Sequence, residues 1–372
     1  MFLLTRLLLH GDVHFGEDAR LFVEGKSALV SDRELVGGRR DIDRDEADLQ
    51  QLFADYRVHV GDEASVTLRP GRQSFQFGAQ RLVSPLPWGN TLRTWDGASA
   101  LVSWRSWSAT AFYSEFVPVD QESFNEADSD LDFYGLYASC EGEGGGGLDV
   151  YWLGYERPMA AFNGTAGREE RDTLGARAWG AIGEGPADYE VEAAWQFGEV
   201  GSGDVSAYML TAVLGYRPEG WSYDPRFWLG FDYASGDDAP GGDVETFNQL
   251  FPLGHAFLGY MDFVGRQNVV DLSAGASVKP ADRLTLNLAG HFFQLADESD
   301  ALYNAGGGVG IAGGVSDDAY AGVEVDLTAV YKYDRHLAFL LGYSHFFAGD
   351  VQEDNGFDDD ADFAYFQLQY TF

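Results

Sequence analysis

Hydrophobic and polar residues alternate with a period of two along most of the chain. In "ADYEVEAAWQF" (residues 187–197) one set of alternate positions is apolar and mostly aromatic, while the other carries Glu190, Glu192 and Gln196. The stretches "PRFWLGFDY" and "GVEVDLTAVYK" repeat the pattern. Successive side chains of a strand point to opposite faces, so the pattern predicts β-strands with one apolar and one polar face. Many stretches reach the roughly 9–11 residues of a tilted membrane strand, whereas soluble strands average about five or six.

About seventeen such stretches can be counted, starting near residues 2, 19, 48, 63, 93, 107, 132, 148, 171, 187, 205, 225, 268, 284, 319, 337 and 363. Connections after odd-numbered strands are mostly short. Those after even-numbered strands are mostly long, as at residues 28–47, 78–92, 156–170, 234–267, 296–318 and 348–361. Short turns at one rim and long loops at the other are typical of outer-membrane barrels. We therefore predict an all-β fold, a transmembrane antiparallel β-barrel that forms a single domain over residues 1–372.

The two ends of the chain also follow the alternating pattern. "MFLLTRLLLHGDVHF" resembles a signal peptide, but it is broken by Asp12 and lacks a small-residue cleavage site, so we predict a strand. Bacterial barrels have even strand numbers, so we expect a total of 18 strands, with the first strand and the export signal missing before Met1. The terminal "DADFAYFQLQYTF" places Phe366, Leu368 and Tyr370 on one face. It predicts a closing strand whose end, Phe372, is read by the barrel-assembly machinery.

Charge and cysteine content exclude several classes of protein. The chain has 60 acidic and 24 basic residues and a formal charge of -36, which argues against nucleic acid as a partner. The acids cluster between predicted strands, as in "SGDDAPGGD" and "QEDNGFDDDAD". The lone Cys140 can form no intramolecular disulfide, and no apolar run reaches the roughly 18 residues of a membrane helix. We predict no cofactor and no metal site.

The polar set of each barrel strand faces the lumen, and it contains Arg6, Arg57, Arg69, Arg177, Arg226 and Lys332. Arg72, Arg81 and Arg93 lie on or beside the strands that flank "GRQSFQFGAQRLVSPLPWGNTLRTWDG". Two interpretations remain open. The arginines either pair with lumenal acids, namely Glu190, Glu192, Asp232, Glu324 and Asp326, or they attract an anionic solute.

Several fragments occur in an order that resembles a known family: "GRQSFQFGAQRLV", "LRTWDG", "DFYGLYAS", "TLGARAWG", "YEVEAAWQFG", "GFDYASGD", "FNQLFPLGHAFLGYMDFVGRQNVVDL", "VEVDLTAVYKY" and "LGYSHFFAGD". Together they resemble the alginate-export family of outer-membrane porins over nearly the whole chain. The resemblance implies an eighteen-stranded barrel that conducts an acidic polysaccharide passively through an arginine-rich constriction. It implies that Arg72 of "GRQ" and Arg93 of "RTWDG" lie in the constriction, with Arg6, Arg81 and Arg177 as further candidates. Arg226, which belongs to the polar set that faces the lumen, is a further candidate site residue.

The stretch 247–268 is too apolar for an exposed loop, since it contains Phe247, Leu250, Phe251 and Phe257 among others. Such a loop must bury its side chains, either in the lumen or across the mouth of the barrel. It could be a packed cap, or it could stack on sugars or gate the channel.

The function that we predict is passive transport across the bacterial outer membrane. The solute is an anionic polysaccharide, alginate or a similar polyuronate, or sugar-acid oligomers. Expected partners are outer-membrane lipid and lipopolysaccharide, the barrel-assembly machinery and periplasmic export proteins. The alternative is a general or differently selective porin of the same fold. An enzyme is disfavoured because Ser344 and His345 are adjacent on a strand and point to opposite faces. The sequence leaves the direction of transport open.

Overall fold

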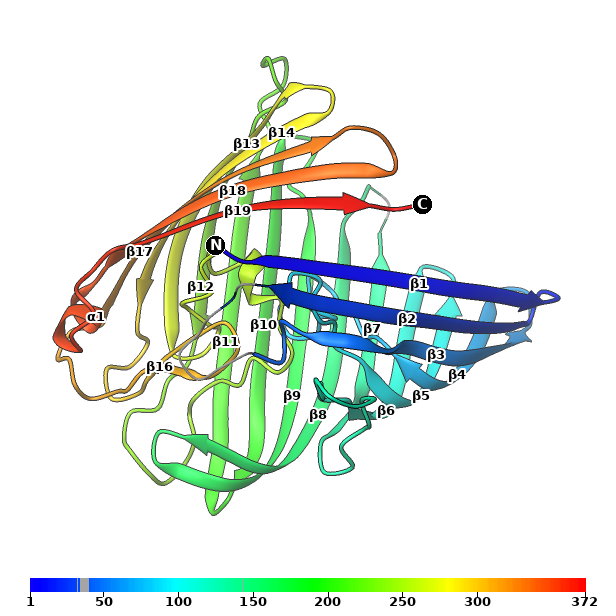
Figure 1. Cartoon of the computed structure of the whole chain (residues 1–372), viewed down its shortest axis with the longest axis horizontal. Helices are drawn as coiled ribbons and strands as arrows, with labels where there is room; N and C mark the ends of the chain where they lie inside the picture. Colours follow the sequence, from blue (N-terminus) through cyan, green and yellow to red (C-terminus); the bar gives the residue numbers. More distant parts are fainter. Residues whose placement is uncertain (32, 34–39, 143) are drawn as a thin grey trace.

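A computed structural model describes residues 1–31, 33, 40–142 and 144–372. Within them, seventeen strands form one sheet in which each strand pairs antiparallel with the next along the chain. The sheet curves round on itself (Figure 1). Its strands are β1 Leu3–Phe15, β2 Ala19–Ser31, β3 Asp45–Val60, β4 Ala64–Gln73, β5 Trp95–Trp104, β6 Trp107–Phe116, β7 Asp132–Glu141, β8 Gly147–Phe162, β9 Thr165–Ala181, β10 Ala187–Val200, β11 Gly203–Tyr216, β12 Arg226–Ala234, β13 Val269–Ala281, β14 Leu284–Gln294, β17 Tyr320–Lys332, β18 Leu337–Ala348 and β19 Ala361–Tyr370.

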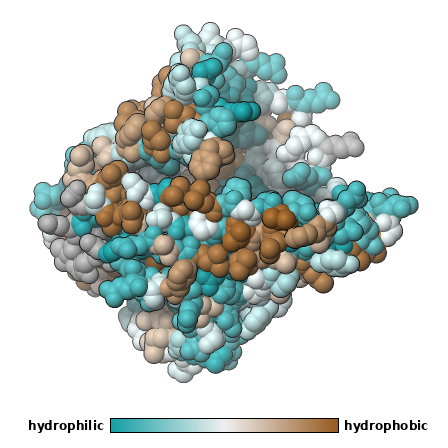
Figure 2. Space-filling model, turned by 45° about the vertical axis from the view of Figure 1, so that its right-hand side comes forward, coloured by the Kyte–Doolittle hydropathy of each residue, from teal (hydrophilic) through white to brown (hydrophobic). Residues whose placement is uncertain are grey.

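The strands are apolar outside and polar inside. In β17, Glu324 and Asp326 are 0% and 2% exposed, whereas the intervening Val325 and the following Leu327 are 36% and 51% exposed. A soluble protein buries apolar residues and exposes polar ones, whereas this sheet does the opposite. That is the arrangement of a barrel whose outer surface meets lipid. Figure 2 shows hydrophobic residues gathered across the middle of one face, with hydrophilic residues above and below.

The predicted strand starts agree with the observed ones to within a few residues in nearly every case. The predicted strand at the N-terminus is β1, which pairs with β2 along its whole length. In the described registers, β1 pairs only with β2, and β19 only with β18. These two strands are the edges of the sheet, and both cross the front of Figure 1.

The long loop predicted at residues 156–170 is wrong. β8 and β9 run on to Phe162 and Thr165 and are joined by the two-residue turn Asn163–Gly164. Both turn residues have positive φ, 34° and 89°, as a type I′ hairpin turn requires, and Asn-Gly is the preferred sequence for that turn. The polar residues that suggested a loop are therefore the tip of a long hairpin.

The remaining elements lie in the connections. β15 Leu302–Tyr303 and β16 Val309–Ile311 form a small hairpin between β14 and β17. The 3-10 helix η1 covers Gly254–Ala256, and the α-helix α1 covers Asp350–Asp354. Among the described residues, no helix combines the length and the apolar character needed to cross a membrane.

Candidate functional site

Two connections fold into the lumen and pack against each other. We call them together the plug: residues 74–94, between β4 and β5, and residues 247–268, between β12 and β13. They are joined by a parallel bridge between Val83 and Phe251, with the amide of Phe251 donating to the carbonyl of Leu82 at 2.9 Å. Phe251 packs among the inward-facing rings of Trp95 and Phe133, and Phe247 is fully buried. Most apolar side chains of residues 247–268 are buried or half-buried, as expected, whereas Phe263 is 41% exposed.

Polar contacts also attach the plug to the barrel wall. Arg266 pairs with Asp232 on β12 and donates to Thr211 Oγ1 at 2.9 Å. On β17, Glu324 accepts a hydrogen bond from the amide of Met261 at 2.8 Å. The two contacts lie on different strands, β12 and β17, so residues 247–268 are attached to the wall at two separate positions.

Arg93 joins the two halves of the plug. Its guanidinium donates to the carbonyl of Pro252 at 2.8 Å and to the carbonyl of Ser84 at 3.5 Å. Burial lowers the pKa of Arg93 to about 10, which leaves the side chain protonated at neutral pH. The guanidinium is thus held by backbone carbonyls.

Between the plug and the wall lies a cavity of about 590 Å³. Wall residues from β9 to β17 form one side and plug residues Arg81, Phe257 and Tyr260 the other. Aromatic rings and charges both reach the cavity. Its charged lining residues are two arginines, Arg81 and Arg226, and four carboxylates, Asp188, Glu190, Asp232 and Asp326.

Arg81 and Arg177 share one carboxylate. Arg81, whose side chain is 3% exposed, pairs with Glu190 and lies 2.9 Å from Glu192. Arg177 lies 3.1 Å from Glu190 and 3.0 Å from Asp149. The arrangement alternates positive and negative groups, so each charge is compensated inside the barrel.

Arg226 is the more accessible cavity arginine. It begins β12, donates to Asp188 at 2.6 Å, and keeps 21% of its side chain exposed. Trp228, two residues further on the same face, also lines the cavity. A cation beside an aromatic ring is a combination that suits a sugar acid, which offers a carboxylate and an apolar ring face.

Arg72 and Arg6 have different surroundings. Arg72 forms a two-pronged pair with Asp96, at 2.7 and 2.8 Å, and donates to the carbonyl of Asn125 at 3.0 Å. In the pairing of β3 with β4, Arg72 lies beside Leu52, whose side chain is 42% exposed on the outer face. Arg6 donates to the carbonyls of Pro87 and Gly89 in the plug.

The structure therefore divides the six predicted site residues into two groups. Arg81, Arg177 and Arg226 lie at or around the cavity, and Arg81 and Arg177 are in one network. Arg6, Arg72 and Arg93 contact loop carbonyls and are not among the described residues that line the cavity.

Sequence reasoning missed Arg266 and Trp228. Arg266 is the single lysine or arginine of the apolar stretch 247–268, and that isolation was a usable signal for a buried ion pair. Trp228 shares the polar set of its strand with Arg226 and Asp232. An aromatic residue on a polar face could have marked a lumenal platform.

Comparison with known proteins places the chain among outer-membrane channels. The family model described as alginate export matches residues 1–364. A search of curated proteins found no match. Solved structures from Pseudomonas aeruginosa share the fold: OpdK with vanillate has 11% identity and a TM-score of 0.62, and it covers 98% of this chain and 93% of its own. OccK2 (OpdF) with glucuronate has 12% identity, a TM-score of 0.62 and coverages of 99% and 90%. OprD has 13% identity and a TM-score of 0.57, and the match covers 99% of this chain and 92% of OprD.

Proposed function

This chain belongs to the alginate-export family and forms a bacterial outer-membrane porin, and we propose that it passes acidic saccharides by passive diffusion. The solute is a polyuronate such as alginate, or sugar-acid oligomers. The observation that carries the proposal is the cavity, where Arg81 and Arg226 lie with Trp228 and Tyr260 around one space. Two solved neighbours hold small carboxylates, vanillate and glucuronate, and glucuronate is a sugar acid.

Arg226 is the residue that we expect to meet the solute first. Its guanidinium is partly accessible and bound to one carboxylate, Asp188. An entering uronate can share or replace that partner, and a charge-assisted hydrogen bond contributes roughly 1.5–3 kcal/mol. Because the uronate replaces a contact that Arg226 already makes with Asp188, the net gain in binding free energy is small. A small gain suits transport, because a solute that binds tightly leaves slowly.

The charge balance of the lumen supports the second candidate function, a general or differently selective porin. The cavity is lined by four carboxylates against two arginines, and both arginines are paired. In this case the arginines compensate lumenal acids and contribute little anion selectivity. The protein acts in either case as a channel.

Conductance of the full-length protein in planar bilayers separates the two functions. We expect oligouronate to block the current and neutral maltodextrin of equal length to do so much less. Arg226→Glu should weaken the block about tenfold, which corresponds to about 1.4 kcal/mol, and should shift the reversal potential in a salt gradient towards cations. Arg226→Gln, which avoids a new repulsion with Asp188, should show a smaller change in the same direction.

The matched control is Arg105→Glu, which makes the same charge change at an exposed turn residue paired with Glu63. It should change block and selectivity much less than Arg226→Glu does. Equal block by uronate and maltodextrin, unaffected by either Arg226 variant, would instead support the general porin.

A further inference from the structure

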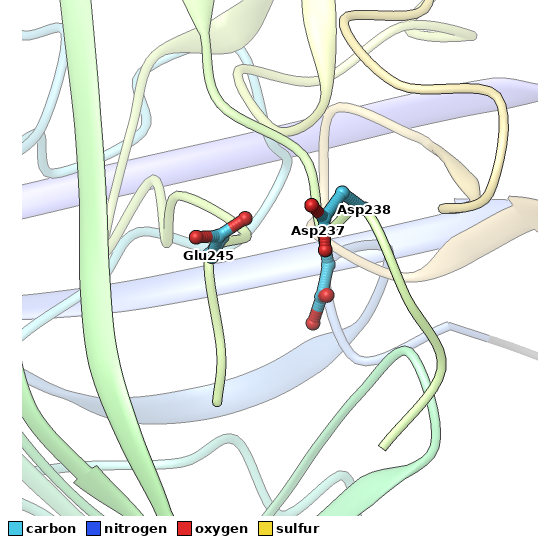
Figure 3. Close-up of side chains that lie close together, drawn as sticks. All are labelled: Asp237, Asp238 and Glu245. Carbon is cyan, nitrogen blue, oxygen red and sulfur yellow. The ribbon is translucent and has the colours of Figure 1, made fainter. Parts of the chain in front are cut away.

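Three carboxylates meet at the start of the β12–β13 connection. Asp237 and Asp238 follow β12 closely, and Glu245 returns to them from further along the loop; one oxygen of each lies within 4.8 Å of the others. Figure 3 shows Glu245 on one segment and the two aspartates on another. None of the three belongs to the cavity described above.

Asp237 is buried without a full set of partners. It is 2% exposed, and its Oδ2 accepts no hydrogen bond from any described residue, whereas its Oδ1 accepts one from the amide of Ala239 at 3.2 Å. A buried carboxylate oxygen without a donor is costly. The neighbouring acids Asp238, Glu245 and Asp300 offer no donor to this oxygen, and a cation would supply the missing partner.

The surrounding contacts hold the two segments in place independently of these carboxylates. Asp300 Oδ2 accepts from the amide of Asp237 at 3.1 Å and from Thr246 Oγ1 at 2.6 Å. Ser235 Oγ donates to the carbonyl of Glu245 at 2.6 Å. Asp237 and Glu245 are thus brought together by neutral donors and by a fourth acid that is already hydrogen-bonded. The three carboxylates remain available for a ligand.

We propose that Asp237, Asp238 and Glu245 bind a divalent cation, Ca²⁺ in preference to Mg²⁺. Two oxygens on opposite sides of Ca²⁺ are about 4.6–5.2 Å apart, given its bond lengths of about 2.3–2.6 Å, so the observed spacing fits around one ion. All three donors are carboxylates on irregular loop segments. Such a set suits the flexible coordination of Ca²⁺ better than the strict octahedron of Mg²⁺.

The position of the ion gives it a structural consequence. Phe247, where the chain enters the plug, follows Glu245 by two residues, and its amide donates to the carbonyl of Ser235 at 3.0 Å. An ion shared by Asp237 and Glu245 closes the loop 235–247 at its base. Calcium outside the cell therefore stabilises the entry to the plug.

Calorimetric titration of CaCl₂ into calcium-depleted, full-length protein in detergent tests the site. The chain has 60 acidic residues, so weak binding of Ca²⁺ elsewhere is expected. The informative quantity is therefore the difference in bound Ca²⁺ between the parent protein and each variant. We expect one ion per chain with a Kd of about 10⁻⁴–10⁻³ M. Asp237→Asn and Glu245→Gln should each weaken it at least about tenfold. Asp317→Asn, the same charge change at an exposed acid of another loop, should leave it unchanged.

Amide exchange provides the second measurement. Exchange over residues 235–247 should slow on adding Ca²⁺ in the parent protein and not in Glu245→Gln, whose side chain is exposed and whose change is compatible with folding. Heat-modifiable mobility in gels checks that each variant is folded. Binding that is equal in the parent, Asp237→Asn and Glu245→Gln overturns the proposal. So does a parent protein that binds no Ca²⁺ at about 10 mM, or one that prefers Mg²⁺.

Discussion

At the scale of single residues, adjacent side chains of one strand face different environments, lipid outside the barrel and the polar lumen inside. Leu327 faces outward at the centre of β17, while its neighbour Asp326 is buried inside and accepts a hydrogen bond from Ser344. A charge added on the outer face must enter hydrocarbon, whereas one added on the inner face meets water and other polar groups. The same substitution therefore reports which face a residue occupies.

We expect Leu327→Arg to reduce the free energy of unfolding by about 2–4 kcal/mol, because the position lies near the middle of its strand. Asn287→Arg, which places the same side chain at a residue that lines the cavity, should cost much less and should alter conductance instead. Denaturant titrations of both variants in lipid vesicles measure the difference. Equal destabilisation would contradict the register.

At the scale of elements, the plug depends on buried ion pairs. Arg266 and Asp232 are 2% and 7% exposed and join residues 247–268 to β12. Removing one partner of a buried pair leaves the other charge uncompensated, which costs about 3–5 kcal/mol, whereas replacing both partners by neutral groups is often tolerated. The pair thus allows the attachment of the plug to be weakened and then restored.

Arg266→Met should weaken the attachment of the plug and increase single-channel current noise, because Asp232 then lacks its partner. The double variant Arg266→Met, Asp232→Asn should be quieter and more stable than the single variant by roughly 1–3 kcal/mol. Single-channel recording and denaturant titration in vesicles measure both effects. A double variant as noisy as the single one would show that this pair does not attach the plug.

At the scale of the whole molecule, charge is distributed unequally between the two rims. The long connections 117–131, 295–319 and 349–360 contain acidic residues and no lysine or arginine. The short turns at the other rim carry Arg105, Arg217, Arg283 and Arg335, which partly offset acids such as Glu63, Asp282 and Asp334. Outer-membrane barrels place their long loops outside the cell, so the outer mouth is the more negative one. An anionic solute is repelled there more strongly than at the periplasmic mouth.

Oligouronate added to the short-turn side should therefore block the channel about tenfold more strongly than oligouronate added to the long-loop side, at about 10 mM salt. At about 1 M salt the Debye length falls to about 3 Å, and the difference between the sides should largely disappear. Recordings from uniformly oriented channels measure the ratio, with neutral maltodextrin as control. Stronger block from the long-loop side at low salt would contradict the charge argument.

The sequence by itself determined the strands, their faces and most of the loop lengths. A period of two sets the face of every residue, and lipid requires the apolar set to lie outside, so the position of Leu327 and the barrel fold follow from local pattern. Local pattern failed at residues 156–170, because a polar hairpin beyond the membrane has no apolar face to reveal its strands. The Asn163–Gly164 turn was the signal available there.

Only the tertiary structure decided which charges meet. Arg81 pairs with Glu190 and Glu192, more than one hundred residues away, and Arg93 donates to the carbonyl of Pro252 in a different loop. The sequence named these arginines and the acids, and it left open whether the arginines were paired or available to a solute. That choice depends on how two loops fold into the lumen. Contacts between distant segments follow from the curvature of the sheet and the packing of the plug, which no local period encodes.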